Sequence, residues 1–152
     1  FAFPAAQSEQ KDCTYIPHVM IMQAGDVKIT SDDPIPHNVH TYAQHNREYN
    51  ESMNQLRSDI SLNFARADVI SVRCDLHAWM QAYVVIAKNP YYAISDKGGK
   101  FTLDGVPAGH YRLKVWSESL GDSDQEIVVE AGKPTKADFT LKSQAAQGSG
   151  AN

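Results

Sequence analysis

Apolar and polar residues alternate along several short stretches of the chain, which is typical of strands with one buried face. The alternation is clearest just before Cys74, which shares one face with Ile70 and Val72 while the residues between them are polar. We therefore predict that Cys74 points inward at the end of a strand. The apolar run over 83–86 predicts a further buried strand next along the chain.

One stretch, 44–63, breaks this pattern. Its apolar residues Met53, Leu56 and Ile60 follow a spacing of i, i+3 and i+7, which places them on one face of a helix. This spacing predicts a short amphipathic helix, with an irregular loop containing a helical turn as the alternative.

Strands and turns alternate over most of the remaining chain. Further strands are predicted on either side of the Gly25-Asp26 turn within 17–30, and over 38–41, 111–116, 126–130 and 137–141. Turn residues at intervals of about 8 to 12 residues are typical of a β-sandwich. We predict an all-β chain with one β-sandwich domain over 1–89, a second small β-sandwich over 90–142, and a flexible tail rich in Gln, Ala, Gly and Ser over 143–152.

The composition argues against several classes of protein. The net charge is −4 and the basic residues are not clustered, which argues against a nucleic-acid-binding surface. No apolar run approaches the length of about 20 residues that a membrane span needs. The chain begins with small residues and no Met, as a trimmed secretory signal can leave behind, so we expect a periplasmic or extracellular protein. Two cysteines are too few for a disulfide scaffold.

The chemistry is concentrated in the segment that follows the strand ending at Cys74. A thiol, an imidazole and a thioether follow at regular spacing as Cys74, His77 and Met80. Soft sulfur ligands together with imidazole favour copper over the other available metals. A second histidine, His37, follows a Pro-rich turn and begins a predicted strand. These residues predict one mononuclear copper site with the ligands His37, Cys74, His77 and Met80.

These motifs resemble the cupredoxins, or type 1 copper proteins. The Cys-x-x-His-x-x-Met spacing and the segment Pro-His-Asn-Val-His at 36–40 are similar to those of amicyanins, and the resemblance covers about residues 10–87. It implies a Greek-key β-sandwich in which His37, Cys74 and His77 are the strong ligands and Met80 the long axial one. It also implies that Asn38 ties the ligand loops together and that Trp79 covers the site.

The later part of the chain resembles the carboxypeptidase-regulatory-like, or prealbumin-like, β-sandwiches. The segment that carries this second resemblance is Gly-Lys-Phe-Thr-Leu-Asp-Gly-Val-Pro-Ala-Gly-His-Tyr-Arg-Leu, at 99–113. The whole chain resembles bacterial proteins that join a cupredoxin domain to such a module. This second module is common in adhesive and accessory domains and implies little about chemistry.

The resemblance implies single-electron transfer with a redox protein partner, such as a cytochrome or a copper or quinone enzyme. His77 is the expected electron port. We expect no enzymatic activity, because four protein ligands leave no open position for a substrate. A structural or adhesive module on the same scaffold, or a copper storage or delivery protein, are the alternatives.

Cys13 is the residue that does not fit this pattern. The sequence leaves three alternatives for Cys13. It is a free thiol, it forms a disulfide with Cys74 that would remove the copper thiolate, or it belongs to the metal site. His18 and His40 are either additional ligands or hydrogen-bonded neighbours of the site.

Overall fold

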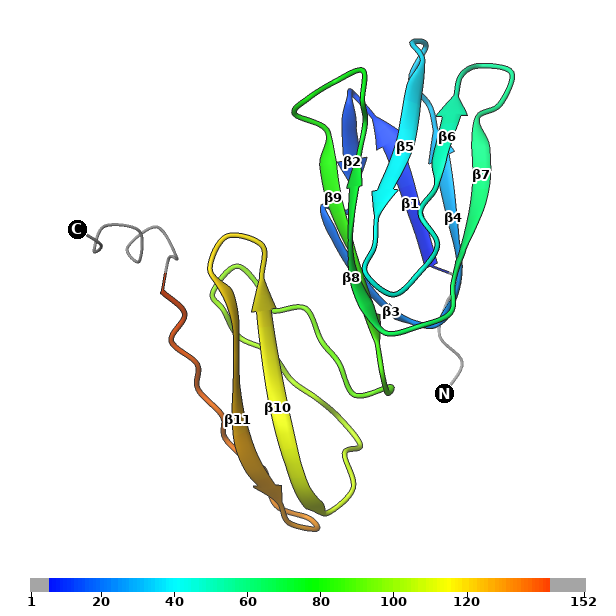
Figure 1. Cartoon of the computed structure of the whole chain (residues 1–152). Coiled ribbons are helices and arrows are strands. Elements are labelled where there is room, and N and C mark those ends of the chain that lie inside the picture. Colours follow the sequence, from blue (N-terminus) through cyan, green and yellow to red (C-terminus); the bar gives the residue numbers. More distant parts are fainter. Residues whose placement is uncertain (1–5, 143–152) are drawn as a thin grey trace, which may run out of the picture. The chain divides into compact units, whose positions relative to one another are not determined.

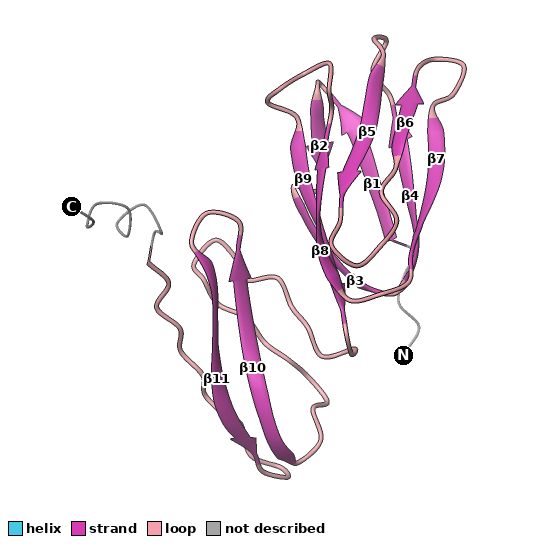
Figure 2. Cartoon of the chain, viewed as in Figure 1, coloured by secondary structure: helices cyan, strands magenta, loops and turns pink. Residues whose placement is uncertain are grey.

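The computed structural model describes residues 6–142, and these contain strands but no helix (Figure 2). The all-β prediction is therefore confirmed. The chain divides into two compact units, Phe1–Leu103 and Asp104–Asn152. Among the described residues, no helix is long and apolar enough to cross a membrane. The tail predicted over 143–152 lies outside the described residues.

The first unit consists of two sheets (Figure 1). One contains, in spatial order, β2 (Thr14–Ile16), β1 (Ala6–Lys11), β4 (Gly25–Ser31) and β7 (Asp59–Phe64). The other contains β3 (Val19–Gln23), β9 (Gln81–Ala87), β8 (Asp68–Arg73), β5 (His37–Tyr42) and β6 (Asn50–Met53). The pairs β1–β4 and β3–β9 are parallel, and the other neighbouring strands are antiparallel.

Alternate residues of these strands form one buried core. Val27 and Ile29 of β4 are buried, as are Ile70 and Val72 of β8. Cys74 follows β8 on the same face and is only 3% exposed. The inward orientation predicted for Cys74 is thus confirmed, because the period of two continues one residue beyond the strand.

The helix predicted within 44–63 is wrong. The structure instead forms β6 and β7, joined by a tight turn in which Asn54 and Arg57 bond to each other through their backbones. Met53 is 1% exposed, whereas Leu56 is 99% exposed. The period of two over 59–64, where every second residue is buried, determines the structure and outweighs the helical spacing of three apolar residues.

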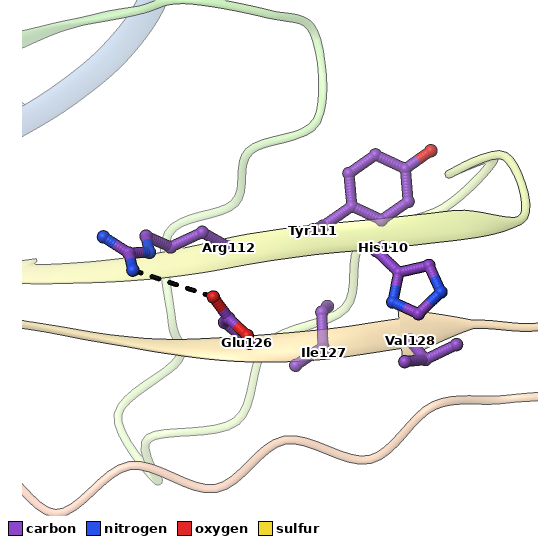
Figure 3. A pocket seen from close by; sticks show the side chains of 6 residues that line it. All are labelled: His110, Tyr111, Arg112, Glu126, Ile127 and Val128. Atoms are coloured by element: carbon purple, nitrogen blue, oxygen red, sulfur yellow. Dashed lines mark ion pairs between the residues drawn. The ribbon is translucent and has the colours of Figure 1, made fainter.

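The second unit contains one described sheet, the hairpin of β10 (Gly109–Ser117) and β11 (Gly121–Val129). Its charged side chains pair across the strands: Lys114 lies 2.7 Å from Asp122, and Arg112 lies 3.8 Å from Glu126. A pocket on the hairpin is lined by His110, Tyr111, Arg112, Glu126, Ile127 and Val128 (Figure 3).

The strand predicted over 137–141 is not formed. Gln125 and Thr135 link this region to the hairpin through side chains, which donate to the carbonyls of Asp138 and Val128. Residues 88–108 also contain no strand, so the boundary that we predicted between 89 and 90 stays a prediction.

Candidate metal centre

The topology of the second sheet brings the ligand residues together. Strands β5 and β8 are antiparallel neighbours, with His40 opposite Arg73. The beginning of β5 therefore lies beside the end of β8. His37 is the first residue of β5 and Cys74 directly follows β8, so two candidate ligands that are far apart in the sequence meet at one end of the sandwich.

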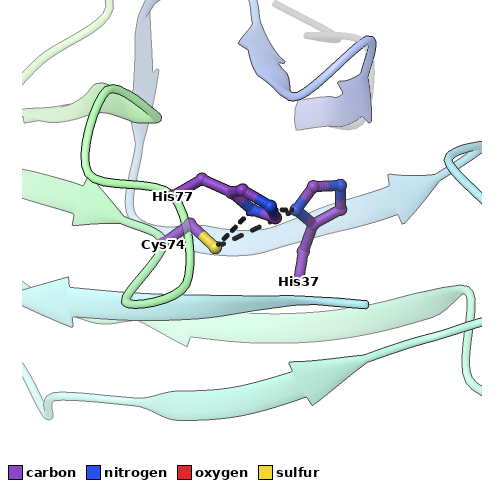
Figure 4. A group of neighbouring side chains, drawn as sticks. All are labelled: His37, Cys74 and His77. Atoms are coloured by element: carbon purple, nitrogen blue, oxygen red, sulfur yellow. Dashed lines mark hydrogen bonds between the residues drawn. The ribbon is translucent and has the colours of Figure 1, made fainter. Parts of the chain in front are cut away.

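A short loop between β8 and β9 adds the third ligand. The amide of Met80 donates to the carbonyl of His77, and the amide of Cys74 donates to the carbonyl of Met80. These two bonds close the loop over 74–80 and turn the imidazole of His77 toward the thiol. Figure 4 shows the side chains of His37, Cys74 and His77 pointing at one another.

The donor atoms converge closely. The Nδ1 atoms of His37 and His77 are 3.0 Å apart, and the Sγ of Cys74 lies 3.9 Å from the first and 3.6 Å from the second. His37 and Cys74 are buried, whereas His77 is half-buried. We refer to these three residues as the inner set.

These separations fit a small metal ion. Metal–nitrogen and metal–sulfur bonds of about 2.0 and 2.3 Å in a trigonal plane place the nitrogens about 3.5 Å apart and the sulfur about 3.7 Å from each. One thiolate and two imidazoles are donors for copper or zinc. Two facing ring nitrogens repel each other unless a proton or a metal ion lies between them, so the inner set is arranged to share one.

Met80 is the fourth residue of the predicted set. Its side chain is 1% exposed and belongs to the same buried core as Cys74. The loop therefore places a thioether in the protein core. Its role as an axial ligand stays a prediction.

Asp33, which lies in the turn before His37, is part of the site. Its Oδ2 lies 2.8 Å from the Nε2 of His37, and its carboxylate also accepts the backbone N–H groups of Asp12 and Cys13. Burial disfavours the charged carboxylate, but these donors outweigh burial and hold the pKa of Asp33 below its ordinary value. A carboxylate bonded to the outer nitrogen of a predicted ligand histidine fixes the orientation of the ring, and no pattern in the sequence indicates this contact.

Asn38 connects the two ligand segments, as the resemblance implies. Its Oδ1 accepts the N–H of Asp75 at 2.6 Å, and its Nδ2 donates to Asp75 and to Asn50, both at 2.8 Å. Hydrogen bonds from His40 and then from Asn38 lower the pKa of Asp75. Because Asp75 follows Cys74 directly, this network holds the ligand loop against β5.

The remaining candidates lie around the inner set and not in it. The Nδ1 of His40 contacts Asp75 at 2.9 Å, and the Nδ1 of His18 contacts the carbonyl of Gln81 at 3.0 Å. The indole of Trp79 packs against the ring of His77 at 5.3 Å but is 66% exposed. Cys13 and Cys74 are both free thiols.

Comparisons with known proteins agree with this description of the first unit. A methionine variant of amicyanin in its Cu(I) state superposes with a TM-score of 0.50 and 22% identity, over 57% of this chain and 86% of amicyanin. A copper-containing nitrite reductase of Thermus scotoductus SA-01 superposes with a TM-score of 0.52 and 11% identity, over 59% of this chain and 24% of the reductase. At these identities the similarity establishes the fold.

The later part of the chain is similar to a different group of proteins. Residues 78–142 match the carboxypeptidase regulatory-like domain. Rhamnogalacturonate lyase B of Emericella nidulans is 34% identical over 84 residues, which are 54% of this chain and 13% of the lyase. The first unit thus has the cupredoxin fold, and residues 78–142 are similar to the carboxypeptidase regulatory-like domain.

Proposed function

We propose that this chain binds one copper ion with His37, Cys74, His77 and Met80 and transfers single electrons outside the cytoplasm. The observation that carries the proposal is the convergence of one sulfur and two imidazole nitrogens within 3.9 Å at the end of a cupredoxin-fold sandwich. Bound copper would supply a reversible change between Cu(I) and Cu(II).

The surrounding residues hold the donor atoms of such a site in place. The hydrogen bond from His37 to Asp33 fixes one ring, and the network of Asn38 and Asp75 fixes the loop that carries the other two donors. Burial of His37 and Cys74 keeps water away from the donors. A site that is held rigidly changes little between oxidation states, so electron transfer requires little reorganisation.

His77 is the proposed path for the electron. It is the one half-buried member of the inner set, and its ring contacts the exposed indole of Trp79. Leu76 is also exposed, at 59%. A redox protein partner that docks on this end would come close to the imidazole of His77.

The optical spectrum tests the proposal. Copper-loaded wild-type protein is expected to bind one copper per chain and to show strong visible thiolate-to-copper(II) absorption. The Cys74→Ser variant should lose this absorption, while His110→Ala, which changes a histidine of the second unit, should keep it. Weak absorption in wild-type protein whose Cys74 is reduced contradicts the proposal.

Voltammetry separates electron transfer from copper storage. The proposal predicts a reversible one-electron wave, and copper that stays bound in both oxidation states. Rapid loss of Cu(I) to a chelator would favour storage or delivery. A Cys13–Cys74 disulfide in the isolated protein would favour a structural module, but both thiols are free in the structure.

A further inference from the structure

A second group of metal-binding side chains lies beside the inner set. Donor atoms of Cys13, Asp33 and His37 all lie within 4.8 Å of one another. Cys13 and Asp33 are half-buried, and His37 is buried. We refer to these residues as the outer set. They provide a thiol and an imidazole, which are donors for copper and zinc, and a carboxylate, which is a donor for zinc.

The two sets share His37 but face different atoms of its ring. The Nδ1 of His37 faces the inner set, 3.9 Å from the Sγ of Cys74 and 3.0 Å from the Nδ1 of His77. Its Nε2 faces the outer set, 2.8 Å from the Oδ2 of Asp33. A neutral imidazole has one free lone pair, because its other ring nitrogen carries hydrogen. The ring can therefore bind a metal ion in only one of the two sets at a time.

The backbone holds Cys13 in this position. Asp12 and Cys13 form the two-residue turn between β1 and β2, with φ values of 51° and 55°, as in a type I′ turn. Asp33 accepts the N–H groups of both residues, and the Nε1 of Trp79 donates to the carbonyl of Cys13 at 3.0 Å. The turn is thus tied both to the outer set and to the ligand loop.

The two thiols differ in their exposure to solvent. Cys13 is half-buried, whereas Cys74 is 3% exposed. An ion that enters at this end meets the thiol of Cys13 before that of Cys74. His37, which belongs to both sets, needs only to exchange the nitrogen that it uses.

We propose that the outer set captures Cu(I) and passes it to the inner set, so that Cys13, Asp33 and His37 form a copper entry site. The proposal rests on the inner set being the copper site proposed above. The transfer is ligand substitution with no change of oxidation state. The Cys13 thiol releases its proton to water on binding copper, and it regains one from water when Cys74 loses its own proton to water and replaces it. The ring proton of His37 moves through water from Nδ1 to Nε2 in the same exchange.

Anaerobic transfer of Cu(I) from a coloured chelator complex to the full chain tests the entry site. In Cys74→Ser, the outer set should still bind one Cu(I), and the double variant Cys13→Ser/Cys74→Ser should bind it about tenfold more weakly or worse. In Cys13→Ser alone, the final affinity should remain close to that of wild type, because the inner set is intact. Its loading should be about tenfold slower or more.

Cys13→Gly is the matched variant that shows whether slow loading is caused by loss of the thiol or by misfolding. Glycine adopts a φ of 55° without strain and removes the thiol, so it should load as slowly as Cys13→Ser. The entry site would be overturned by two results together. Cys74→Ser and the double variant would bind Cu(I) with equal affinity, and both Cys13→Ser and Cys13→Gly would load copper as fast as wild type. Failure of the copper site itself would appear separately, as wild-type protein without Cys74-dependent absorption.

Discussion

At the scale of single residues, His37 and Asn38 each contact two different parts of the site. His37 directs one ring nitrogen to the inner set and the other to Asp33. Asn38 uses its oxygen for the amide of Asp75 and its nitrogen for Asp75 and Asn50. Removing one such side chain therefore loosens two segments at once.

The carboxylate of Asp33 should contribute stability that depends on pH. Its pKa is lowered in the folded state, so this contribution is complete above the unfolded-state pKa of an aspartate, about 3.9, and is lost as the pH falls through the lower folded value. Asp33→Asn should cost about 1 to 2 kcal/mol at pH 7.

Urea unfolding of the metal-free protein at several pH values measures this effect. The difference between wild type and Asp33→Asn should shrink as the solution becomes acidic. A difference that is constant from neutral pH to pH 3 would show that the charge of Asp33 does not stabilise the fold. Asp32→Asn, which changes the neighbouring carboxylate, is the control.

Asn38 should be more important than its partner Asn50. Asn38 is buried, at 7% exposure, whereas Asn50 is exposed. Asn38→Ala leaves the N–H of Asp75 without its acceptor and should lower the free energy of unfolding by about 1 to 3 kcal/mol. Asn50→Ala should have a clearly smaller effect in the same denaturation experiment, and equal losses would contradict the role given to Asn38.

At the scale of elements, β5 carries His37, and the short loop between β8 and β9 carries the other three predicted ligands. Alternation predicts β8 and the burial of Cys74, because a period of two is unambiguous over six residues. The turn from β6 to β7 was missed because three apolar residues at helical spacing conceal a strand, a turn and a strand. Leu56 lies at that turn and faces the solvent.

The β6–β7 region can be tested with a matched pair of variants. Met53→Ala removes a side chain from the core and should lower the free energy of unfolding by about 2 to 5 kcal/mol. Leu56→Ala should change it by less than about 0.5 kcal/mol, because Leu56 is 99% exposed. On a helix with a buried face both residues would be sensitive, so similar losses for the two variants in chemical denaturation would contradict the strands.

At the scale of the whole molecule, the two units differ in how they are built. The first has a core of buried residues, whereas no described residue of the second is fully buried. The local Cys-x-x-His-x-x-Met spacing predicts Cys74 and His77, and the need for a second histidine, which follows the Pro-rich turn, predicts His37. Asp33 and the outer set could not be predicted, because they depend on the approach of the β1–β2 turn to His37.

This difference predicts separate unfolding transitions. Trp79 belongs to the first unit and Trp116 to the second, and the chain has two tryptophans. In Trp79→Phe the fluorescence reports the second unit, which should unfold at a lower urea concentration than the first unit reported by Trp116→Phe. Copper should raise only the transition of the first unit. One common transition, shifted equally by copper, would contradict two independent units.

X-ray absorption at the copper edge tests the central claim most directly. For copper-loaded wild-type protein, the account predicts one short copper–sulfur bond and two imidazole nitrogens. The sulfur should persist in Cys13→Ser and disappear in the double variant Cys13→Ser/Cys74→Ser. A copper environment of nitrogen and oxygen alone, or a sulfur that depends on Cys13 and not on Cys74, would contradict the account.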